Sequence, residues 1–464
     1  MSRESNERVD ALLALGERIV EKARKAGADV AECSVRQGDH LSVKVRMGHP
    51  ELVEEAGSKA VGLRVMVGQQ VAVTYTSDLT AQGIQRFVED AMELVKLSQP
   101  DPFAGPPDAS LLSTREQHAD LELFDPDMSA LDAAEALRRA KAGEAAALAV
   151  DKRLTNSEGG SFTRASGASA LVTSGGFRGG GEGTYASIVV SPVAEEPGVG
   201  DQAGKKRSGH YWAARRKLSA LEDAGDVGRE AARRTLAKLG ARKVDTQEVA
   251  VIFDQDAARA MLGLLAGAVN GSSIWRKSSY LVDREGTRVA SELVDVVDDP
   301  FLIAGPGSRP YDGEGLLSRR NVVVEKGILK TYLLDTYSAK KLGKQSTASA
   351  SRGSSGGVGP GSTNFILQPG TMTPEELLRS TERALYVTDM MGFGFNAVTG
   401  DFSRGASGFW IEKGEKVFPV SEVTISLNVD QIFQRIDAVA SDLDLRTSIA
   451  SPTFRVSAMT LAGK

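Results

Sequence analysis

From about residue 243 onward, the sequence is a succession of short valine-rich stretches separated by Gly, Asp and Asn. These stretches are VAVIF at 249–253, RNVVVEKGILKTYLLD at 320–335, STNFILQPG at 362–370, GFWIEKGEKVFPVSEVTISLN at 408–428 and FRVSAMTLAG at 454–463. Valine and isoleucine favour strands, and the residues between them favour turns. The spacing therefore predicts a β-rich C-terminal domain over 243–464, barrel-like or sandwich-like. We expect decorating helices at 255–269, 336–342, 373–390 and 428–438.

The N-terminal region has a different pattern. Apolar residues at helical spacing predict a first helix over 7–26. Alternation of apolar and polar residues then predicts strands at 30–37, 40–47 and 60–76. A second helix, capped by Ser77 or Asp78, is expected to run to about residue 98. Helix, strands and helix together predict a two-layer α+β unit.

Four prolines lie in the segment SQPDPFAGPPDAS at 98–110. Because proline lacks a backbone N–H donor and opposes regular structure, we expect a linker there, between an N-terminal domain (1–110) and a middle α/β domain (111–242). The elements predicted in the middle domain are helices at 129–150 and 226–240 and strands at 162–173 and 184–192. The glycine runs at 175–183 and 353–361 match no phosphate-binding motif and are expected to be flexible loops.

Composition excludes several classes of function. The chain has 61 acidic and 56 basic residues, a net charge of −5, which gives no general attraction to nucleic acid or anionic lipid. Its one basic cluster with aromatic residues, GKKRSGHYWAARRK at 204–217, is interpreted as a surface or domain-contact segment, so no direct nucleic-acid binding is predicted. The N-terminus lacks a secretory signal and no run of 18 apolar residues occurs, which predicts a cytoplasmic protein without a membrane span.

Histidine and cysteine, the usual zinc ligands, are missing from the second half of the chain. The four histidines are His40, His49, His118 and His210, and the single cysteine is Cys33, which is expected to be buried and inert. A zinc site of the usual kind therefore cannot be built from the C-terminal domain alone. The acidic stretch DVVDDP at 295–300 is expected to be a solvated turn rather than a carboxylate metal site.

The segment TGDFSRGASGFWIEKGE at 399–415 places Asp401, Ser403 and Arg404 in what we expect to be a glycine-spaced loop. A serine nucleophile needs an activating base, and the only histidine that could approach Ser403 is His210, from another domain. Turn formation explains the segment better than catalysis does.

Five ordered motifs in the C-terminal half carry a resemblance to a known family. They are VIFDQDAARAMLGLLAGAVNG at 251–271, SSIWRKSSYLVDREG at 272–286, YDGEGLLSRRNVVVEKGILKTYLLDTYSAKKLG at 311–343, TGDFSRGASGFWIEKGE at 399–415 and PVSEVTISLN at 419–428. With these motifs the chain resembles the TldD/PmbA family, in its PmbA (TldE) branch. The resemblance covers nearly all of the C-terminal domain, whereas residues 1–200 agree mainly in layout. It implies a bacterial or archaeal cytosolic protein that pairs with TldD in a heterodimeric zinc metalloprotease acting on unfolded or leader-type peptides.

The same resemblance identifies three positions on the helix at 255–269. In TldD the equivalent helix carries HExxxH, whose histidines bind zinc and whose glutamate can act as a general base. Aligned on the shared pair Arg276-Lys277, these positions fall on Gly263, Leu264 and Ala268. None of the three side chains can bind a metal, so we expect no cofactor on this chain and zinc on the TldD-like partner.

A subunit of this kind would contribute by binding and assembly. A β-rich domain with exposed edges can take up an extended peptide as an additional strand. Candidate contacts with substrate or partner are Arg276, Lys277, Asp401, Ser403 and Arg404, although the same residues can equally fix loops through ion pairs and turns. Three alternatives remain: a stand-alone homodimeric peptide-binding or regulatory protein, a hydrolase that uses Ser403 and Asp401, and direct action on DNA gyrase, which the composition does not favour.

Overall fold

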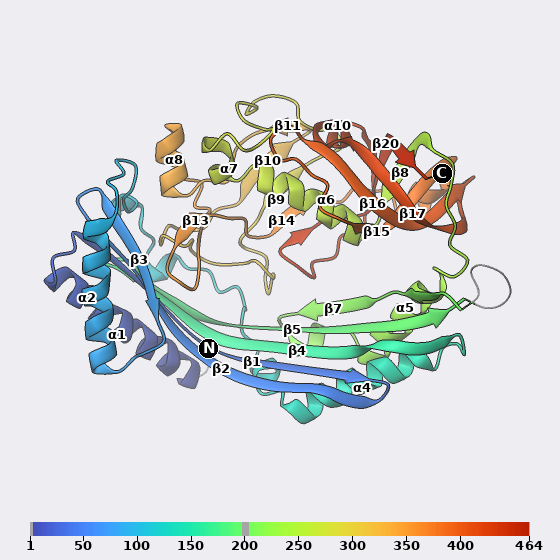
Figure 1. Cartoon of the computed structure of the whole chain (residues 1–464). Coiled ribbons are helices and arrows are strands. Elements are labelled where there is room, and N and C mark those ends of the chain that lie inside the picture. The colour runs from blue at the N-terminus through green and yellow to red at the C-terminus, as the bar shows by residue number, and fades with distance from the viewer. Residues whose placement is uncertain (1–2, 197–203, 464) are drawn as a thin grey trace.

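The chain folds into a long curved sheet covered by a second, β-rich half (Figure 1). The computed structural model describes residues 3–196 and 204–463. The sheet has seven strands in the order β3-β2-β1-β4-β5-β6, and β7 also pairs with β5. Their bounds are β1 Val30–Arg46, β2 His49–Val67, β3 Gln70–Thr76, β4 Leu154–Thr173, β5 Arg178–Glu195, β6 Lys206–Ser208 and β7 Tyr211–Arg215. The predicted regions 1–110 and 111–242 thus share one sheet, through pairing of β1 with β4.

Two pairs of helices cover one face of this sheet. Helices α1 (Arg3–Lys25) and α2 (Ala81–Leu97) pack on one end, and α4 (Ala133–Leu148) and α5 (Ala224–Leu236) pack on the other. The odd-numbered positions 31, 33, 35, 41, 43 and 45 of β1 are buried under these helices. Because alternate side chains of a strand point to opposite faces, the other face of the sheet is left for the C-terminal half. The linker between α2 and α4 contains two 3-10 turns, Ala109–Leu111 and Arg115–Gln117, and the short helix α3, Pro126–Ser129.

Two predictions for this region need correction. The run at 175–183 is not a flexible loop, because Gly179 to Gly183 belong to β5 and pair with β4. A Cβ on Gly180 would lie 2.7 Å from Val9 Cγ1, so glycine lets helix α1 approach the strand. The cap of α2 is Thr80, whose side chain accepts from the Gly83 N–H, rather than Ser77 or Asp78.

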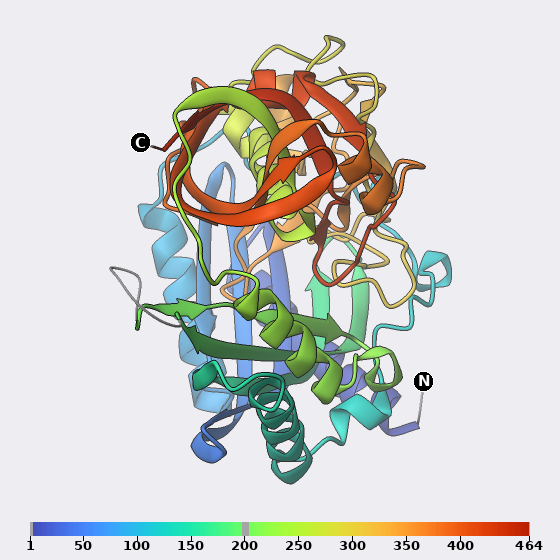
Figure 2. The ribbon, with the colours of Figure 1, turned by 90° about the vertical axis from the view of Figure 1, so that its right-hand side faces the viewer.

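The C-terminal half contains a closed barrel, seen nearly end-on in Figure 2. Its five strands follow the order β17-β16-β15-β8-β20, and β17 pairs with β20 to close the ring. Their bounds are β8 Gln247–Phe253, β15 Arg383–Met391, β16 Asp401–Glu412, β17 Glu415–Asn428 and β20 Phe454–Ala462. Strand β18 (Ile436–Val439) pairs antiparallel with β20. The predicted α+β class with a β-rich, barrel-like C-terminal domain is confirmed.

Beside the barrel lies a second, five-stranded sheet in the order β11-β10-β9-β14-β19. Its strands are β9 Val296–Asp298, β10 Asn321–Glu325, β11 Ile328–Leu329, β14 Phe365–Leu367 and β19 Ile449–Ala450, and a separate hairpin joins β12 (Ala350–Arg352) to β13 (Val358–Pro360). The helices of this half are α6 Gln255–Ala268, α7 Gly271–Trp275, α8 Thr336–Leu342, α9 Pro374–Arg379 and α10 Val429–Gln434. No helix within 3–196 or 204–463 is long and apolar enough to cross a membrane.

Four expectations for the C-terminal half are wrong. The helix predicted at 373–390 ends with α9, where the Ser380 and Thr381 hydroxyls donate to the Leu377 carbonyl, and the rest becomes β15 because it pairs in parallel with β8. The helix predicted at 428–438 likewise gives way to β18. The loop predicted at 399–415 is mostly β16. The acidic stretch at 295–300 is no solvated turn, since Asp298 is 1% exposed and accepts the Thr363 N–H at 2.6 Å.

The two halves are joined by a buried ion cluster. Arg352, at the end of β12, donates to Glu32 of β1 at 2.5 Å, and Arg64 of β2 lies 3.2 Å from the same carboxylate. The loop that follows Arg352 presses on β2, because a Cβ on Gly62 would lie 2.5 Å from the Gly356 nitrogen. Burial opposes ionisation of Glu32, but the two guanidinium groups outweigh it and lower the pKa of Glu32. The C-terminal half is therefore anchored on the helix-free face of the sheet.

Candidate functional site

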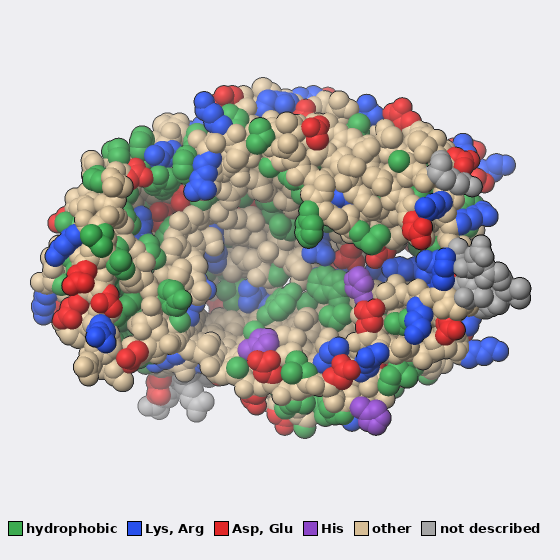
Figure 3. Space-filling view, in the orientation of Figure 1, with side chains coloured by type: hydrophobic (Ala, Val, Ile, Leu, Met, Phe, Trp, Pro, Cys, Tyr) green, Lys and Arg blue, Asp and Glu red, His purple; other side chains and the backbone are tan. Residues whose placement is uncertain are grey.

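Helix α6 lies on the side of the C-terminal half that faces the sheet (Figures 1 and 2). It follows β8 directly, and its N-cap Asp254 accepts the Ala257 N–H at 2.9 Å. One face of the helix is buried in the core of the barrel, through Ala257, Ala258, Met261, Leu262, Leu265 and Ala268. The space-filling view in Figure 3 shows the molecule hollowed between the two halves. The other face of α6 is thus available to line this hollow.

The three positions aligned with HExxxH do not form a metal site. At Gly263 a Cβ would have only Ile449 Cδ1 near it, at 4.0 Å, so this position is open. Leu264 packs against the barrel core, and Ala268 is 4% exposed. Glycine, leucine and alanine offer no ligand atom, and within the described ranges no group of three His, Cys, Asp or Glu side chains could hold a metal ion. Gly263, Leu264 and Ala268 therefore supply no donor atom for zinc.

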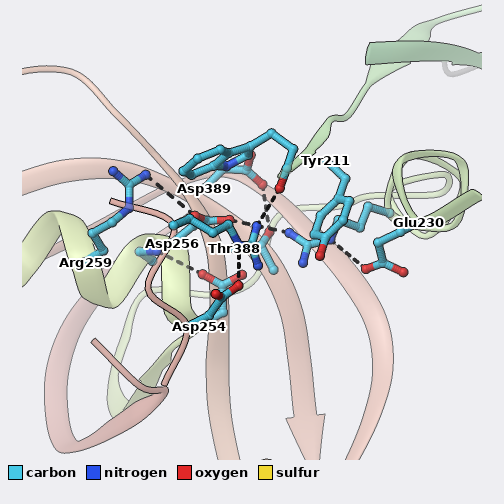
Figure 4. A network of polar contacts seen from close by, with 12 residues as sticks. Tyr211, Glu230, Asp254, Asp256, Arg259, Thr388 and Asp389 are labelled. Carbon is cyan, nitrogen blue, oxygen red and sulfur yellow. Dashed lines mark hydrogen bonds and ion pairs between the residues drawn. The ribbon is translucent and has the colours of Figure 1, made fainter. Parts of the chain in front are cut away.

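A polar network holds the N-terminal end of α6 against the sheet (Figure 4). Asp256 lies 3.6 Å from both Arg234 of α5 and Arg259 of α6. The guanidinium of Arg259 lies over the ring of Trp212, 5.6 Å from its centroid. Because α5 and Trp212 belong to the middle region, the network joins that region to the barrel.

The segment 204–217 supplies further contacts between the two halves. Arg215 pairs with Asp444 at 3.0 Å, and Arg216 donates to the carbonyls of Gly305 and Pro306. Arg446 donates to the Trp212 carbonyl at 2.9 Å. Because Trp212 belongs to the edge strand β7, this bond satisfies one of the backbone acceptors at that edge. These bonds make the segment a domain contact, as interpreted from the sequence.

The pKa of Asp254, which lies in this network, is raised far above the ordinary value of an aspartate. Removal of its carboxylate from water raises its pKa to about 7, and the neighbouring charges of Asp256 and Asp389 add to the rise, whereas the Ala257 N–H and Arg234 oppose it. The unfolded chain loses this proton near the ordinary value of 3.8. Between these two values the folded state holds more protons than the unfolded state, so raising the pH favours unfolding.

We therefore expect Asp254→Asn to gain stability relative to the wild type as the pH rises from 4 to 7. Asparagine caps helices as well as aspartate does and does not titrate. The gain should reach on the order of 1 kcal/mol per pH unit. Urea denaturation at several pH values measures it, with Asp223→Asn, at the N-cap of α5, as the control for the cap itself. If the difference in stability between Asp254→Asn and the wild type stays constant from pH 4 to 7, the raised pKa of Asp254 is contradicted.

The other end of α6 leads to Arg276 and Lys277. Arg276 is exposed and lies over the ring of Trp275 at 4.8 Å, and Lys277 has a left-handed backbone with φ of 57°. Arg276 and Trp275 line a cavity of about 400 Å³ between the sheet and the C-terminal half. Three residues after Lys277, the Tyr280 N–H donates to the Ala397 carbonyl at 2.8 Å.

That bond joins the segment after Lys277 to the turn that precedes Asp401, Ser403 and Arg404. All three of the latter lie on β16. Asp401 accepts from Thr399 Oγ1 at 2.7 Å and from Asn428 Nδ2 at 3.3 Å, so it fixes the turn before the strand.

Ser403 and Arg404 have no catalytic partners in this region. The Ser403 N–H donates to Gly394, and no hydrogen bond within the described ranges joins its hydroxyl to a base. Arg404 lies over the ring of Phe402 at 5.6 Å. His210, the one histidine that could serve Ser403, lines a different cavity, with Ser407. The geometry provides no serine-based catalytic group here.

Sequence reasoning missed two buried charge clusters. One is the Glu32, Arg64 and Arg352 cluster, and the other contains Asp312, Glu314 and Asp335, which are 1–2% exposed. The motif YDGEG at 311–315 places two of these acids, Asp312 and Glu314, next to glycines, which is the only local signal for this cluster. Their burial depends on contacts with residues far along the chain, which the local pattern does not reveal.

Comparison with known proteins assigns the family. Three family models match in order: PmbA/TldA metallopeptidase domain 1 over 31–95, the central domain over 126–239 and the C-terminal domain over 246–463. The chain is 36% identical over 437 residues to "Metalloprotease PmbA" of Escherichia coli O157:H7, covering 94% of this chain and 93% of the relative. This chain belongs to the PmbA/TldD family. A PmbA homolog from Haemophilus influenzae is also 36% identical, over 447 residues that cover 96% of this chain and 94% of the relative.

Solved structures agree with this PmbA/TldD assignment. A putative modulator of DNA gyrase from Bacteroides thetaiotaomicron superposes with a TM-score of 0.89 at 25% identity, covering 97% of this chain and 98% of that chain. TldE from Thermococcus kodakarensis gives a TM-score of 0.87 at 20% identity, covering 97% of this chain and 100% of that chain, which shows a shared fold. The chain is thus a metallopeptidase-like protein of the PmbA/TldE type.

Proposed function

We propose that this chain is the zinc-free subunit of a heterodimeric metalloprotease of the TldD/TldE type in the cytoplasm, and that it binds unfolded or leader peptides for a partner that carries HExxxH and zinc. One observation carries the proposal. Helix α6 has Gly263, Leu264 and Ala268 where the motif would place its ligands, and no histidine or cysteine occurs after residue 210. A chain that keeps the fold of the family without metal-binding side chains contributes by holding a peptide or a partner.

The hollow between the two halves is the place where we propose that a peptide lies. The barrel is closed by the pairing of Thr424 to Ser426 with Thr460 to Ala462, so a peptide cannot enter that ring as an extra strand. The open face of α6 has free space beside it at Gly267, since a Cβ there would meet no atom within 4 Å. Arg276, Lys277, Asp401, Ser403 and Arg404 are the proposed contacts with substrate or partner at the end of α6.

The alternatives have weaker support. A hydrolase based on Ser403 lacks a base partner for that hydroxyl within the described residues. Direct action on DNA or gyrase has no support in the net charge of −5, and the aromatic and arginine side chains of 211–216 take part in contacts within the molecule. A homodimeric peptide-binding protein shares the same hollow and differs only in its partner.

An assay of peptide hydrolysis tests the proposal. The purified chain, a purified HExxxH-bearing paralogue and their mixture are each given an unfolded casein-derived peptide. Hydrolysis should require the paralogue, should be strongest in the mixture and should stop when the zinc is chelated. The double variant Arg276→Ala and Arg404→Ala should weaken hydrolysis by the mixture, whereas Arg233→Ala, which removes an exposed ion pair on α5, should not. Chelator-insensitive hydrolysis by the isolated chain would contradict the proposal.

A further inference from the structure

The cavity beside Arg276 combines buried acids with aromatic rings. Its volume is about 400 Å³, which is within the range of ligand-binding pockets. Trp275, Tyr337, Glu314, Asp335 and Asp101 line it, and the exposed Arg276 stands at its rim. These residues come from the linker after α2, from α7 and α8, and from the YDGEG motif. The cavity therefore forms only when the two halves come together.

Two of the acids in this cavity, Glu314 and Asp335, lack a basic partner, whereas Asp101 lies 3.8 Å from the Lys341 ammonium. Glu314 is 2% exposed and uses one oxygen, Oε2, to accept from Thr336 N at 2.9 Å and Thr336 Oγ1 at 2.6 Å. Its other oxygen, Oε1, accepts no hydrogen bond from the described residues. Asp335 accepts the Ser338 N–H at 2.8 Å. Within the same ranges no lysine or arginine forms an ion pair with Glu314 or Asp335, so neither carboxyl group has a cation in contact with it.

The nearby carboxylate of Asp312 is held in place by backbone N–H groups and contributes to the raised pKa of Glu314. It accepts from the N–H groups of Glu314, Leu316 and Ala350. Burial, together with the nearby carboxylate of Asp312, raises the pKa of Glu314 to about 8. Without a cation in the cavity, Glu314 is therefore mostly protonated at neutral pH, and a cation that binds there would displace the proton.

The aromatic rings on one side of the cavity already contact a cation of the protein itself, the ammonium group of Lys341. Trp275 and Tyr337 are arranged edge to face with ring centroids 5.7 Å apart. The Lys341 ammonium lies 5.4 Å and 5.3 Å from these two centroids, and 4.1 Å from that of Phe103. Aromatic faces attract ammonium and guanidinium groups. Two arginines, Arg64 and Arg276, also line the cavity. Arg64 is paired with Glu32 and therefore does not serve as the partner of Glu314.

We propose that this cavity binds the basic side chain, lysine or arginine, of the peptide that the proposed function places in the hollow. The cation would lie against Glu314 and the rings of Trp275 and Tyr337, and the adjoining backbone would lie at the rim near Arg276. The inference rests on the proposed function, because it names the side chain by which a bound peptide is recognised.

Two end-blocked peptides that differ at one position test the inference. One contains a single lysine and the other contains Nε-acetyl-lysine, which keeps the length of the side chain and removes its charge. Binding to the full chain is measured by calorimetry at pH 7, and the lysine peptide should bind at least tenfold more tightly. Glu314→Gln, which keeps an acceptor for Thr336, should abolish that preference, whereas Glu292→Gln, at an exposed site, should not.

A second measurement needs no variant. Binding of the lysine peptide should release up to one proton from the cavity, where Asp101, Asp312, Asp335, Arg64, Arg276 and Tyr337 are the other ionisable groups that face or adjoin Glu314. The release appears as a difference in binding enthalpy between two buffers of unlike ionisation enthalpy. If the lysine peptide binds without releasing a proton, its cation does not displace the proton of Glu314, and the assignment of Glu314 as its partner is overturned.

The outcomes separate the two proposals. If both peptides bind equally, or if the preference survives Glu314→Gln, the cavity does not read a basic side chain, and peptide binding itself still stands. If n-butylamine binds as tightly as the lysine peptide, the cavity is a site for small amines and the peptide assignment is wrong. If neither peptide binds, the proposed peptide-binding function fails.

Discussion

Replacing Arg352 with alanine is expected to lower the free energy of unfolding by about 3–5 kcal/mol, because the change leaves a buried carboxylate without its main partner. The Arg352 side chain is 4% exposed and that of Glu32 is 1% exposed. Arg352 also donates to the carbonyls of Gly313 and Gly356, at 2.7 Å and 3.0 Å. All of these acceptors would lose a charged donor at once.

The position of Arg352 in the fold increases the effect. It belongs to the C-terminal half, whereas Glu32 and Arg64 belong to the sheet, so the cluster is a buried polar link between the halves. Urea denaturation followed by fluorescence measures the loss. Arg178→Ala, which removes the exposed pair with Glu17 at 2.6 Å, is the control and should change stability by less than about 1 kcal/mol. Equal losses in the two variants would contradict this account of the cluster.

Replacing Gly228 with alanine should destabilise the protein by about 3 kcal/mol, in spite of the higher helix propensity of alanine. Gly228 lies on α5 where that helix crosses α4, and an added Cβ would lie 2.0 Å from the Gly143 carbonyl oxygen. The nearest atom belongs to a backbone, so the clash cannot be relieved by a change of rotamer. The two helices would have to separate, although both are packed on the sheet.

The matched control is the same substitution at an open helical position. At Gly267 on α6 no atom lies within 4 Å of the added Cβ. Alanine should therefore stabilise α6 there by about 1 kcal/mol, through helix propensity alone. Opposite signs at the two positions are the expected result in urea denaturation. A neutral or stabilising Gly228→Ala would show that the helix crossing is looser than the structure has it.

The parts of the fold that could be predicted from the sequence are those set by local pattern. Helix α8 occupies 336–342 as expected, and α6 begins after Asp254 because its cap and its apolar face are both local signals. The helix predicted over 373–390 failed for a tertiary reason. Residues 384–387 become a strand because they pair with β8, more than 130 residues earlier in the chain.

Long-range contacts also explain what the sequence did not reveal about the sheet and the site. The pairing of β1 with β4 has no local signal, and the glycines of β5 resemble a loop until α1 is known to pack on them. Gly263, Leu264 and Ala268 were found through the family resemblance. The acids of the cavity near Arg276 could not be predicted, because a buried glutamate differs from a solvent-exposed one only by its surroundings.

The zinc content of the purified chain is the sharpest test of whether this subunit lacks a metal site of its own. The isolated protein, equilibrated with micromolar zinc at neutral pH and then freed of unbound metal, is analysed by atomic emission beside an HExxxH-bearing paralogue. Because neither α6 nor the rest of the C-terminal half supplies an imidazole or a thiolate, we expect no bound zinc on this chain and one zinc ion on the paralogue. One tightly held zinc ion per chain, removed by EDTA, would contradict it.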